Sequence, residues 1–284
     1  MSRYLGYDLT IESDIEPPGA LPLEGGSAGP PDVEIRFGPA HIDPAASPRG
    51  PYRYVGGRLL FAAPGVANYL CEAVGRIVVE PAPGADDEMV EALLVATALP
   101  AILWMRDLLV LHAAAVVMPG ADCAIAIAGR SGAGKSSVLH CLLAHGASAA
   151  ADDSVAIARA GCRLVASGLP AAYFLRAATA ATRDLVPVPP AQRTRAAPLG
   201  AIFVLDRSSE GPAFERLAPV EAVEHMLRHR HRPQIPLVLG RIGRTFDDCV
   251  FLARSVPIFL WRRRDGAVRL SDEEISALAR GAQG

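Results

Sequence analysis

One segment constrains the fold of this chain more than any other: residues 129–136, with the sequence GRSGAGKS. It matches G-x-x-x-x-G-K-[ST], a loop that wraps a phosphate between a strand and a helix. The flanks agree with the motif, because AIAIA at 124–128 predicts a buried strand and SVLHCLL at 137–143 has helical spacing. The chain is therefore expected to bind a nucleoside triphosphate.

Each residue type in this loop has a physical reason. Glycines let the backbone N–H groups point inward at a phosphate, and the start of the helix adds a positive dipole end. Lys135 supplies a charge for the β- and γ-phosphates, and the Ser136 hydroxyl is suited to Mg²⁺. The predicted nucleotide-binding residues are Gly129, Arg130, Ser131, Gly132, Ala133, Gly134, Lys135, Ser136 and Ser137.

Composition excludes several classes of protein. The chain has 284 residues, enough for one large domain or two modest ones, and is 51% hydrophobic. A net charge of −2 with no basic block at chain scale gives no support for nucleic-acid binding. The five cysteines, Cys162 among them, have no CxxC spacing, which argues against a metal site or a disulfide framework. We therefore expect a reducing, cytoplasmic location, and the first 12 residues do not resemble a signal peptide.

Residues 89–118 are strongly apolar and need a separate explanation. A membrane span requires about 20 uninterrupted apolar residues. Here Glu91, Pro100, Arg106 and Asp107 interrupt the run. A buried helix, opened by an aspartate at 86 or 87 and reaching about residue 99, followed by a buried strand over 108–118, is the better prediction, and no membrane partner is expected.

The chain divides into a β-rich unit over residues 1–84, loop-rich at 13–50, and a P-loop core over residues 85–284. In the first unit we expect strands at 33–37 and 76–80 and a hairpin with strands at 52–55 and 58–61. In the second, strands are expected at 147–151, 155–157, 163–165, 173–175, 201–205 and 257–261, and residues 186–198 are expected to be an exposed loop. Strands alternating with helices predict an α/β fold.

Two helices are expected near the C-terminus. Residues 219–228 form an amphipathic pattern with Val220, Val223 and Leu227 on one face. Residues 271–274, with the sequence SDEE, predict a capping box that opens the last helix. The arginines at 262–264 are expected on the surface.

A P-loop site needs an acid to hold Mg²⁺ and, in a kinase, a group that orients the attacking hydroxyl. Asp152 and Asp153 follow the P-loop helix by one turn and one short strand, which returns them to the sheet edge beside the loop. The pair could divide the work, one acid binding metal and the other accepting a proton. Asp206, at the end of the 201–205 strand, is the second candidate for the metal acid.

Three features occur in order: His112 in the run LHAAAV, the P-loop, and the Asp152–Asp153 pair in ADDSV. Together they resemble HPr kinase/phosphorylase and its relatives, whose P-loop core is similar to that of phosphoenolpyruvate carboxykinase. In that family a histidine lies on the strand before the P-loop strand, and an Asp-Asp pair follows the P-loop helix. The resemblance covers residues 105–160 and implies a P-loop kinase core of this type.

The resemblance also implies roles for individual residues. Lys135 would neutralise the β- and γ-phosphates, and Ser136 and Asp152 would hold Mg²⁺. Asp153 would deprotonate or orient the acceptor hydroxyl, and His112 would lie beside it and tune it. Without the resemblance, His112 could equally be a hydrogen-bonded core histidine.

Departures from the family pattern bear on the substrate. Ser137 stands where kinase/phosphorylase members carry glutamate, and their second signature region is not recognisable near residues 167–170. The chain is more similar to the shorter HPr-kinase-like proteins of ribosomal peptide pathways, such as those of lasso peptides. These phosphorylate a serine of a precursor peptide, so the resemblance implies ATP, Mg²⁺ and a serine-bearing peptide or small protein as partners.

Several alternatives stay open at this point. The arginine that stabilises the transferred phosphoryl group could be Arg130, Arg241, Arg244 or a member of the RHRHR run at 228–232, although that run also suits a solvated helix end. Instead of a peptide kinase, the chain could be a P-loop ATPase or switch that uses Asp206, or a small-molecule kinase. The sequence also leaves open whether the chain forms a homo-oligomer.

Overall fold

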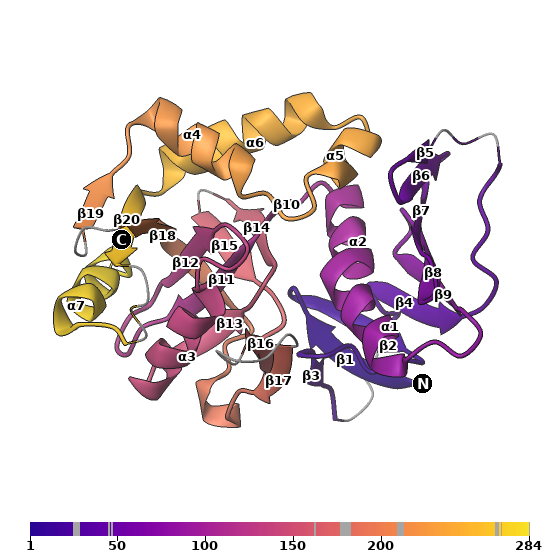
Figure 1. Cartoon of the computed structure of the whole chain (residues 1–284), viewed down its shortest axis with the longest axis horizontal. Helices are drawn as coiled ribbons and strands as arrows, with labels where there is room; N and C mark the ends of the chain where they lie inside the picture. Colours follow the sequence, from indigo (N-terminus) through magenta and orange to yellow (C-terminus); the bar gives the residue numbers. More distant parts are fainter. Residues whose placement is uncertain are drawn as a thin grey trace.

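The strands of the N-terminal part form one twisted sheet, drawn in indigo and purple in Figure 1. The computed structural model describes residues 1–284 except 25–28, 45, 47, 162, 177–182, 209–212, 265, 266, 268 and 284. The sheet contains β1 (Ser2–Gly6), β2 (Leu9–Ser13), β3 (Leu21–Pro22), β4 (Val33–Phe37), β5 (Pro48–Arg49), β6 (Tyr52–Val55), β7 (Arg58–Ala63), β8 (Ala67–Glu72) and β9 (Arg76–Pro81). Their order is β3-β1-β2-β4-β9-β8-β7-β6-β5.

The hairpin predicted from residues 52–61 is confirmed. Strands β6 and β7 pair antiparallel with Val55 opposite Arg58. Gly56 and Gly57 both have positive φ, 55° and 77°, as a two-residue primed turn requires. The predicted strands at 33–37 and 76–80 correspond to β4 and β9.

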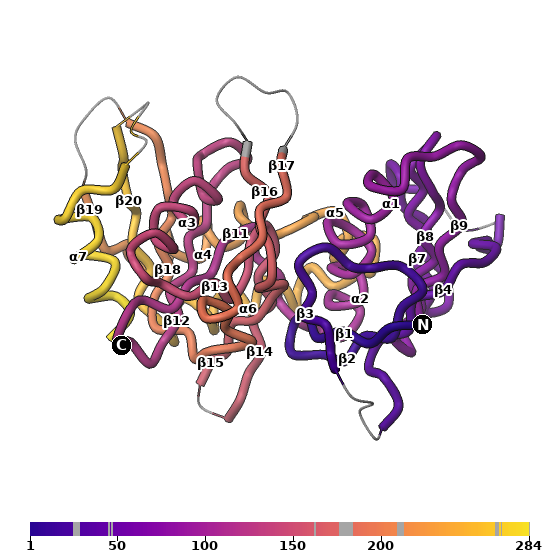
Figure 2. The backbone as a smooth tube through the Cα atoms, turned by 90° about the horizontal axis from the view of Figure 1, so that it is seen from below, coloured from indigo at the N-terminus to yellow at the C-terminus, as the bar shows by residue number. Residues whose placement is uncertain are grey.

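A continuous helical segment connects this sheet to the rest of the chain. It consists of α1 (Asp87–Leu93), a π-helical turn η1 (Leu94–Ala98) and α2 (Leu99–Met105). The segment is long and apolar enough to cross a membrane by length and composition, but 67% of its most apolar stretch is buried inside the protein. Figures 1 and 2 both draw it between the N-terminal sheet and the second half of the chain.

Pro100 neither ends nor breaks this helical segment. Proline has no N–H to donate to the carbonyl four residues earlier, here that of Ala96. The chain instead widens into the π-turn just before Pro100, a usual way to relieve such a conflict. Arg232 donates a hydrogen bond from Nε to the Ala96 carbonyl at 2.9 Å.

The second half of the chain is built on a second sheet around β12. The strands of this half are β10 (Leu109–Leu111), β11 (Ala113–Val117), β12 (Ala124–Gly129), β13 (Ser148–Ala151), β14 (Val155–Ala160), β15 (Arg163–Ser167), β18 (Ala196–Ser208), β19 (Ala213–Arg216) and β20 (Ile258–Arg264), with a separate hairpin of β16 (Ala172–Arg176) and β17 (Arg183–Pro187). Strand β12 pairs parallel with β18 and antiparallel with β11. The carboxyl ends of β12 and β18 therefore lie together, where ligands of α/β sheets usually bind.

Helices cover this sheet on both sides. They are α3 (Lys135–Ala144), α4 (Pro219–Arg228), α5 (Gln234–Val238), α6 (Ile242–Ser255) and α7 (Asp272–Gly281), with a 3-10 turn η2 (Pro190–Gln192). Figure 1 shows α4, α5 and α6 along the top of the molecule and α3 below the sheet. A mixed α/β architecture is thus confirmed, and so is the capping box of α7, in which Ser271 and Glu274 cap each other.

The structure corrects several sequence expectations. The predicted strand over 108–118 is broken at His112, because β10 pairs with β14 whereas β11 pairs with β12. Residues 186–198 are not an exposed loop: they contain the end of β17, the η2 turn and the start of β18, and Val188 is buried. Strand β18 continues past Asp206 to Ser208.

Two expectations about side-chain burial need correction. On α4, Val223 and Leu227 pack against the core as expected, but Val220 is 72% exposed and the fully buried residues are Ala222 and Met226. Arg263 is not a surface residue, because its guanidinium donates to the buried Glu274 carboxylate at 2.7 Å. Cys71, Cys123, Cys141 and Cys249 are free thiols, and Cys162 lies outside the described residues.

Candidate active site

The phosphate-binding loop lies between β12 and α3. Its Gly132 and Gly134 have φ of 81° and 102°, values that side-chain-bearing residues rarely adopt. Within the described part of the chain no side chain caps the first turn of α3, so its N–H groups are available to an anion. Ser131 and Ser137 are exposed on either side of this turn. The loop is therefore shaped to receive a phosphate, as its sequence predicts.

Lys135 is 6% exposed and held from three sides. Its Nζ donates to the carbonyl oxygens of Gly129 at 3.0 Å and Arg130 at 3.1 Å. The third contact joins Nζ to Nε2 of His112 at 2.8 Å. The ammonium group is thus positioned at the mouth of the loop before any phosphate arrives.

Ser136 and Asp152 form the second pair of the site. The Ser136 hydroxyl lies 3.0 and 3.1 Å from the two carboxylate oxygens of Asp152, one of which also accepts from the Phe174 amide at 3.1 Å. Burial, followed by the charge of Asp153, raises the pKa of Asp152 to about 6. A buried carboxylate beside a hydroxyl is the type of oxygen-ligand set that Mg²⁺ prefers, and a cation would offset the cost of ionising the acid.

Asp153 points in a different direction from Asp152. It adopts φ of 64°, an unusual conformation for a residue with a side chain, in a turn closed by the Ser154 amide and the Asp152 carbonyl at 2.7 Å. The turn lies between β13 and β14. The turn directs the Asp152 carboxylate to the Ser136 hydroxyl, and the Asp153 carboxylate faces a different set of groups.

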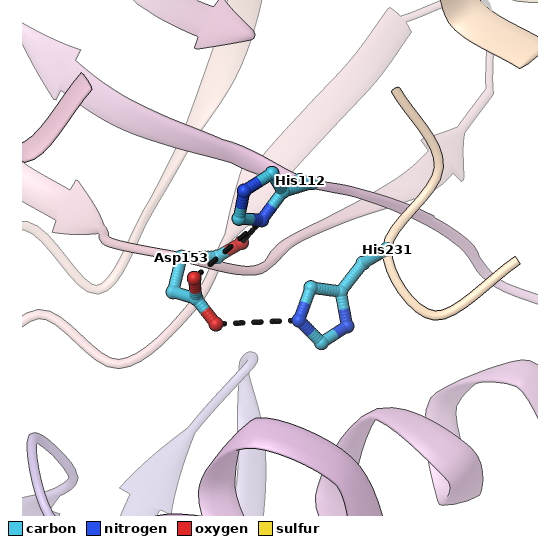
Figure 3. A group of neighbouring side chains, drawn as sticks. All are labelled: His112, Asp153 and His231. Atoms are coloured by element: carbon cyan, nitrogen blue, oxygen red, sulfur yellow. Dashed lines mark hydrogen bonds and ion pairs between the residues drawn. The ribbon is translucent and has the colours of Figure 1, made fainter. Parts of the chain in front are cut away.

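Two histidines flank the Asp153 carboxylate (Figure 3). His231 Nε2 lies 3.3 Å from Oδ2, and His112 Nδ1 lies 3.5 Å from Oδ1 and 3.1 Å from the Asp153 backbone carbonyl. Because an ammonium group can only donate, His112 accepts from Lys135 at Nε2, and this assigns its proton to Nδ1. The set therefore forms a chain from Lys135 through His112 to Asp153.

The charges of this chain follow from burial and from neighbours. Burial, followed by the charge of Lys135, lowers the pKa of His112 to about 4, so the ring is neutral at neutral pH. Burial acts to raise the pKa of Asp153, but the hydrogen bond and charge of His231 outweigh it and hold this pKa below its usual value. Asp153 is therefore an ionised acceptor. The ligand atoms of His112, Asp153 and His231 also lie within 4.8 Å of one another, a donor set that suits a transition metal.

Sequence reasoning missed His231, because the RHRHR run looked like a solvated helix end. That expectation is wrong for most of the run. His229 and His231 are buried, Arg230 donates to the Leu227 carbonyl and Arg232 to the Ala96 carbonyl. Only Arg228 is exposed within this run. The Trp104 indole donates to the His231 carbonyl, and the His231 amide donates to the Val110 carbonyl, so the backbone of this histidine is held at both groups.

The N-terminal sheet also contributes to this region, and no sequence signal pointed to it. Tyr7, in the turn between β1 and β2, lies with its hydroxyl 2.5 Å from Ser154 Oγ. Its amide donates to the Gly168 carbonyl at 2.8 Å. Both side chains of the Tyr7–Ser154 pair are buried. The turn that carries the two aspartates is therefore connected to the N-terminal part of the chain by the hydrogen bond between Ser154 and Tyr7.

The other candidate residues are not brought into this cluster. Asp206 is exposed on β18, opposite Arg262 of β20. Arg241 and Arg244 pair with Asp107 beyond the opposite end of β10. The arginine that does contact the loop is Arg207, whose Nε donates to the Ala133 carbonyl at 2.8 Å. Nothing in the sequence pointed to Arg207 beyond its position at a strand end.

Comparisons with known proteins give little further guidance. The sequence matches no protein-family model and no curated protein. Among solved structures, that of the Hpr(Ser) kinase/phosphatase from Coxiella burnetii is similar over 60% of this chain and 88% of that chain, with 14% identity and a TM-score of 0.38. The likeness is distant and does not indicate a function for this chain.

Proposed function

We propose that this chain is an ATP- and Mg²⁺-dependent serine kinase, which transfers the γ-phosphate to a serine hydroxyl of a peptide or small protein. One observation carries the proposal: the two adjacent aspartates beside the phosphate loop face different partners. Asp152 faces the Ser136 hydroxyl, whereas Asp153 faces two histidines, next to Lys135. A site that only held a nucleotide would not need the second acid.

The residues divide the work as follows. The loop amides and Lys135 bind the phosphates and orient the γ-phosphoryl group. Ser136 and Asp152 would hold Mg²⁺, which neutralises charge on the phosphates when it is bound. Asp153 accepts a hydrogen bond from the serine hydroxyl and orients it for attack. As the O–P bond to serine forms and the bond to the departing diphosphate breaks, the serine proton passes to the Asp153 carboxylate.

The electrostatics of Asp153 suit this task. A lowered pKa keeps the carboxylate ionised over the working pH range. Phosphoryl transfer has a loose transition state in which little proton transfer is needed early, so orientation matters more than base strength. The neutral His112 ring keeps Asp153 and Lys135 at fixed positions without adding a charge of its own.

For the acceptor we propose a ribosomally made precursor peptide of the lasso type. This finer proposal rests on the sequence resemblance and on Ser137, which replaces the glutamate of kinase/phosphorylase members. A cytoplasmic location and the absence of nucleic-acid and membrane partners belong to the same proposal.

The direct test is mass spectrometry of serine-containing peptides incubated with the protein, ATP and Mg²⁺. A kinase adds the mass of one phosphoryl group to the peptide, and replacing the serine with alanine abolishes this product. ATP hydrolysis without any phosphorylated acceptor would instead favour a P-loop ATPase or switch.

A further inference from the structure

A cavity lies beside the phosphate loop, away from the two aspartates. It has a volume of about 470 Å³ and is found at the carboxyl end of β18, between the start of the loop and the end of α4. The polar residues that line it are Arg130, Asp206, His225, Arg228 and His229. The proposed transfer reaction uses none of the side chains of α4 in this wall.

The wall of this cavity is mostly positive or able to donate hydrogen bonds. His229 lines the cavity and is 8% exposed. Nδ1 of His225 is buried and has no hydrogen-bond partner among the described residues. Buried polar groups usually have a partner, so this unpaired imidazole nitrogen in a residue of the cavity wall indicates a ligand.

The remaining charges favour a small anion. Among the described residues Arg228 pairs with Glu224 alone, at 3.6 Å, and both side chains are largely exposed, so this arginine is easily diverted to a ligand. Burial, then His225 and Lys135, lowers the pKa of His229 to about 4, as expected in a positive field. Asp206 is the one acid among the described residues of the wall. It disfavours a dianionic phosphate more than a singly charged carboxylate.

The cavity is connected to the proposed transfer site through the backbone. The His112 amide donates to the His229 carbonyl at 2.7 Å, and the Arg130 carbonyl accepts from Lys135. Arg130 and His229 are therefore the same residues whose carbonyl oxygens contact Lys135 and the His112 amide, so a group bound between their side chains would lie next to the proposed transfer site. This is where a residue next to an accepting serine would be found.

We propose that this cavity binds a carboxylate side chain of the acceptor, so that the substrates are serine peptides with an aspartate or glutamate close to the serine. The inference rests on the proposed kinase function. Arg130 and Arg228 supply the charge, and the two histidines supply N–H donors to the carboxylate oxygens. Charge-assisted hydrogen bonds of this kind are about twice as strong as neutral ones.

Peptide binding to the full chain tests this without requiring transfer. The protein is saturated with a non-hydrolysable ATP analogue and Mg²⁺, and titrated with two labelled hexapeptides that differ only in glutamate or glutamine beside a single serine. The glutamate peptide should bind about tenfold more tightly, a difference of one charge-assisted contact. Arg228→Gln should remove this preference, and Asp206→Asn should increase it, whereas Arg254→Gln, at an exposed arginine near the end of α6, should leave it unchanged.

Equal affinity for the two peptides would overturn the proposal, as would a preference that neither Arg228→Gln nor Asp206→Asn alters. Exclusion of the glutamate peptide by the ATP analogue would also overturn it, because the cavity would then belong to the nucleotide. A preference that depends on Arg228 without phosphorylation of any peptide would support the carboxylate site and contradict the kinase function, so the two claims can fail separately.

Discussion

Nζ of Lys135 lies 2.8 Å from Nε2 of His112, so the lysine predicted to bind phosphate has an uncharged acceptor in the free protein. The same histidine contacts the Asp153 backbone carbonyl through Nδ1 at 3.1 Å. His112 thus joins the phosphate-binding lysine to the residue proposed to orient the acceptor. It can do so because it lies at the break between β10 and β11 rather than within a strand.

This relationship predicts how His112 contributes. His112→Ala should slow phosphoryl transfer by about 100-fold, the cost of misplacing the reacting groups by about 1 Å. ATP affinity should change by less than about threefold, since the loop amides and the carbonyl contacts of Lys135 are kept. Single-turnover transfer and nucleotide titration measure the two effects. His41→Ala, at an exposed histidine, is the control, and an equal fall in ATP affinity and transfer rate would contradict the linking role.

The ionisation of Asp152 predicts a pH-dependent stability. Its pKa rises from 3.8 to about 6 in the folded protein, so ionising it opposes folding. This acid therefore contributes stability below about pH 4, and the contribution is lost as the pH rises through about 6. Asp152→Asn should raise the free energy of unfolding of the nucleotide-free protein by about 1 to 3 kcal/mol at pH 8.

Urea unfolding at two pH values checks this prediction. The gain from Asp152→Asn should shrink by at least half at pH 4.5, where the wild-type acid is largely protonated in the folded state. A gain that is the same at both pH values, or a loss at pH 8, would show that Asp152 is not a strained acid in the free protein. With Mg²⁺ and ATP added, the variant should gain less stability than the wild type.

The contact between Tyr7 and Ser154 predicts a coupling between the N-terminal sheet and the aspartate turn. Tyr7→Phe leaves the buried Ser154 hydroxyl without its partner and should cost about 1 to 3 kcal/mol of stability. Ser154→Ala should cost a similar amount. The double variant should cost clearly less than the sum, because no buried hydroxyl is then left unpaired. Additive losses in this double-mutant cycle would mean that the two hydroxyls do not interact.

A buried ion pair joins the C-terminal helix α7 to strand β20. Arg263 and Glu274 are 2.7 Å apart, with side chains 2% and 6% exposed. Glu274→Gln leaves a buried guanidinium unpaired and should cost about 3 to 5 kcal/mol in urea unfolding. Glu224→Gln, in the exposed pair with Arg228, is the matched control and should cost less than about 1 kcal/mol. Similar losses in the two variants would contradict this assignment.

The phosphate loop and its flanks could be predicted because their signals are local. The apolar run before Gly129 and the helical spacing after Lys135 correspond to β12 and α3. The return of Asp152 to the loop also follows from chain length, since one helix, one turn and one strand leave it 3.0 Å from Ser136 Oγ. Hairpin glycines and the Ser271 capping box are local signals as well.

Contacts between distant segments were not predictable in the same way. His231 reaches Asp153 across 78 positions, and its arginine neighbours suggested solvent. Tyr7 reaches Ser154 across 147 positions. The break at His112 has no local cause: the flanking runs are equally apolar, and only their pairing with β14 and β12 separates them. Burial of Arg263 likewise depends on a helix that follows it in the chain.

The central claim is that Asp153 acts on the acceptor while Asp206 does not act on the metal. The most direct measurement compares Asp153→Asn and Asp206→Asn by quantitative mass spectrometry of a phosphorylated serine peptide, with nucleotide affinity measured in parallel. We predict that Asp153→Asn lowers transfer by about 100-fold or more with ATP affinity within threefold of the wild type, and that Asp206→Asn retains most of the transfer. The opposite order, with transfer lost in Asp206→Asn and kept in Asp153→Asn, would contradict the account.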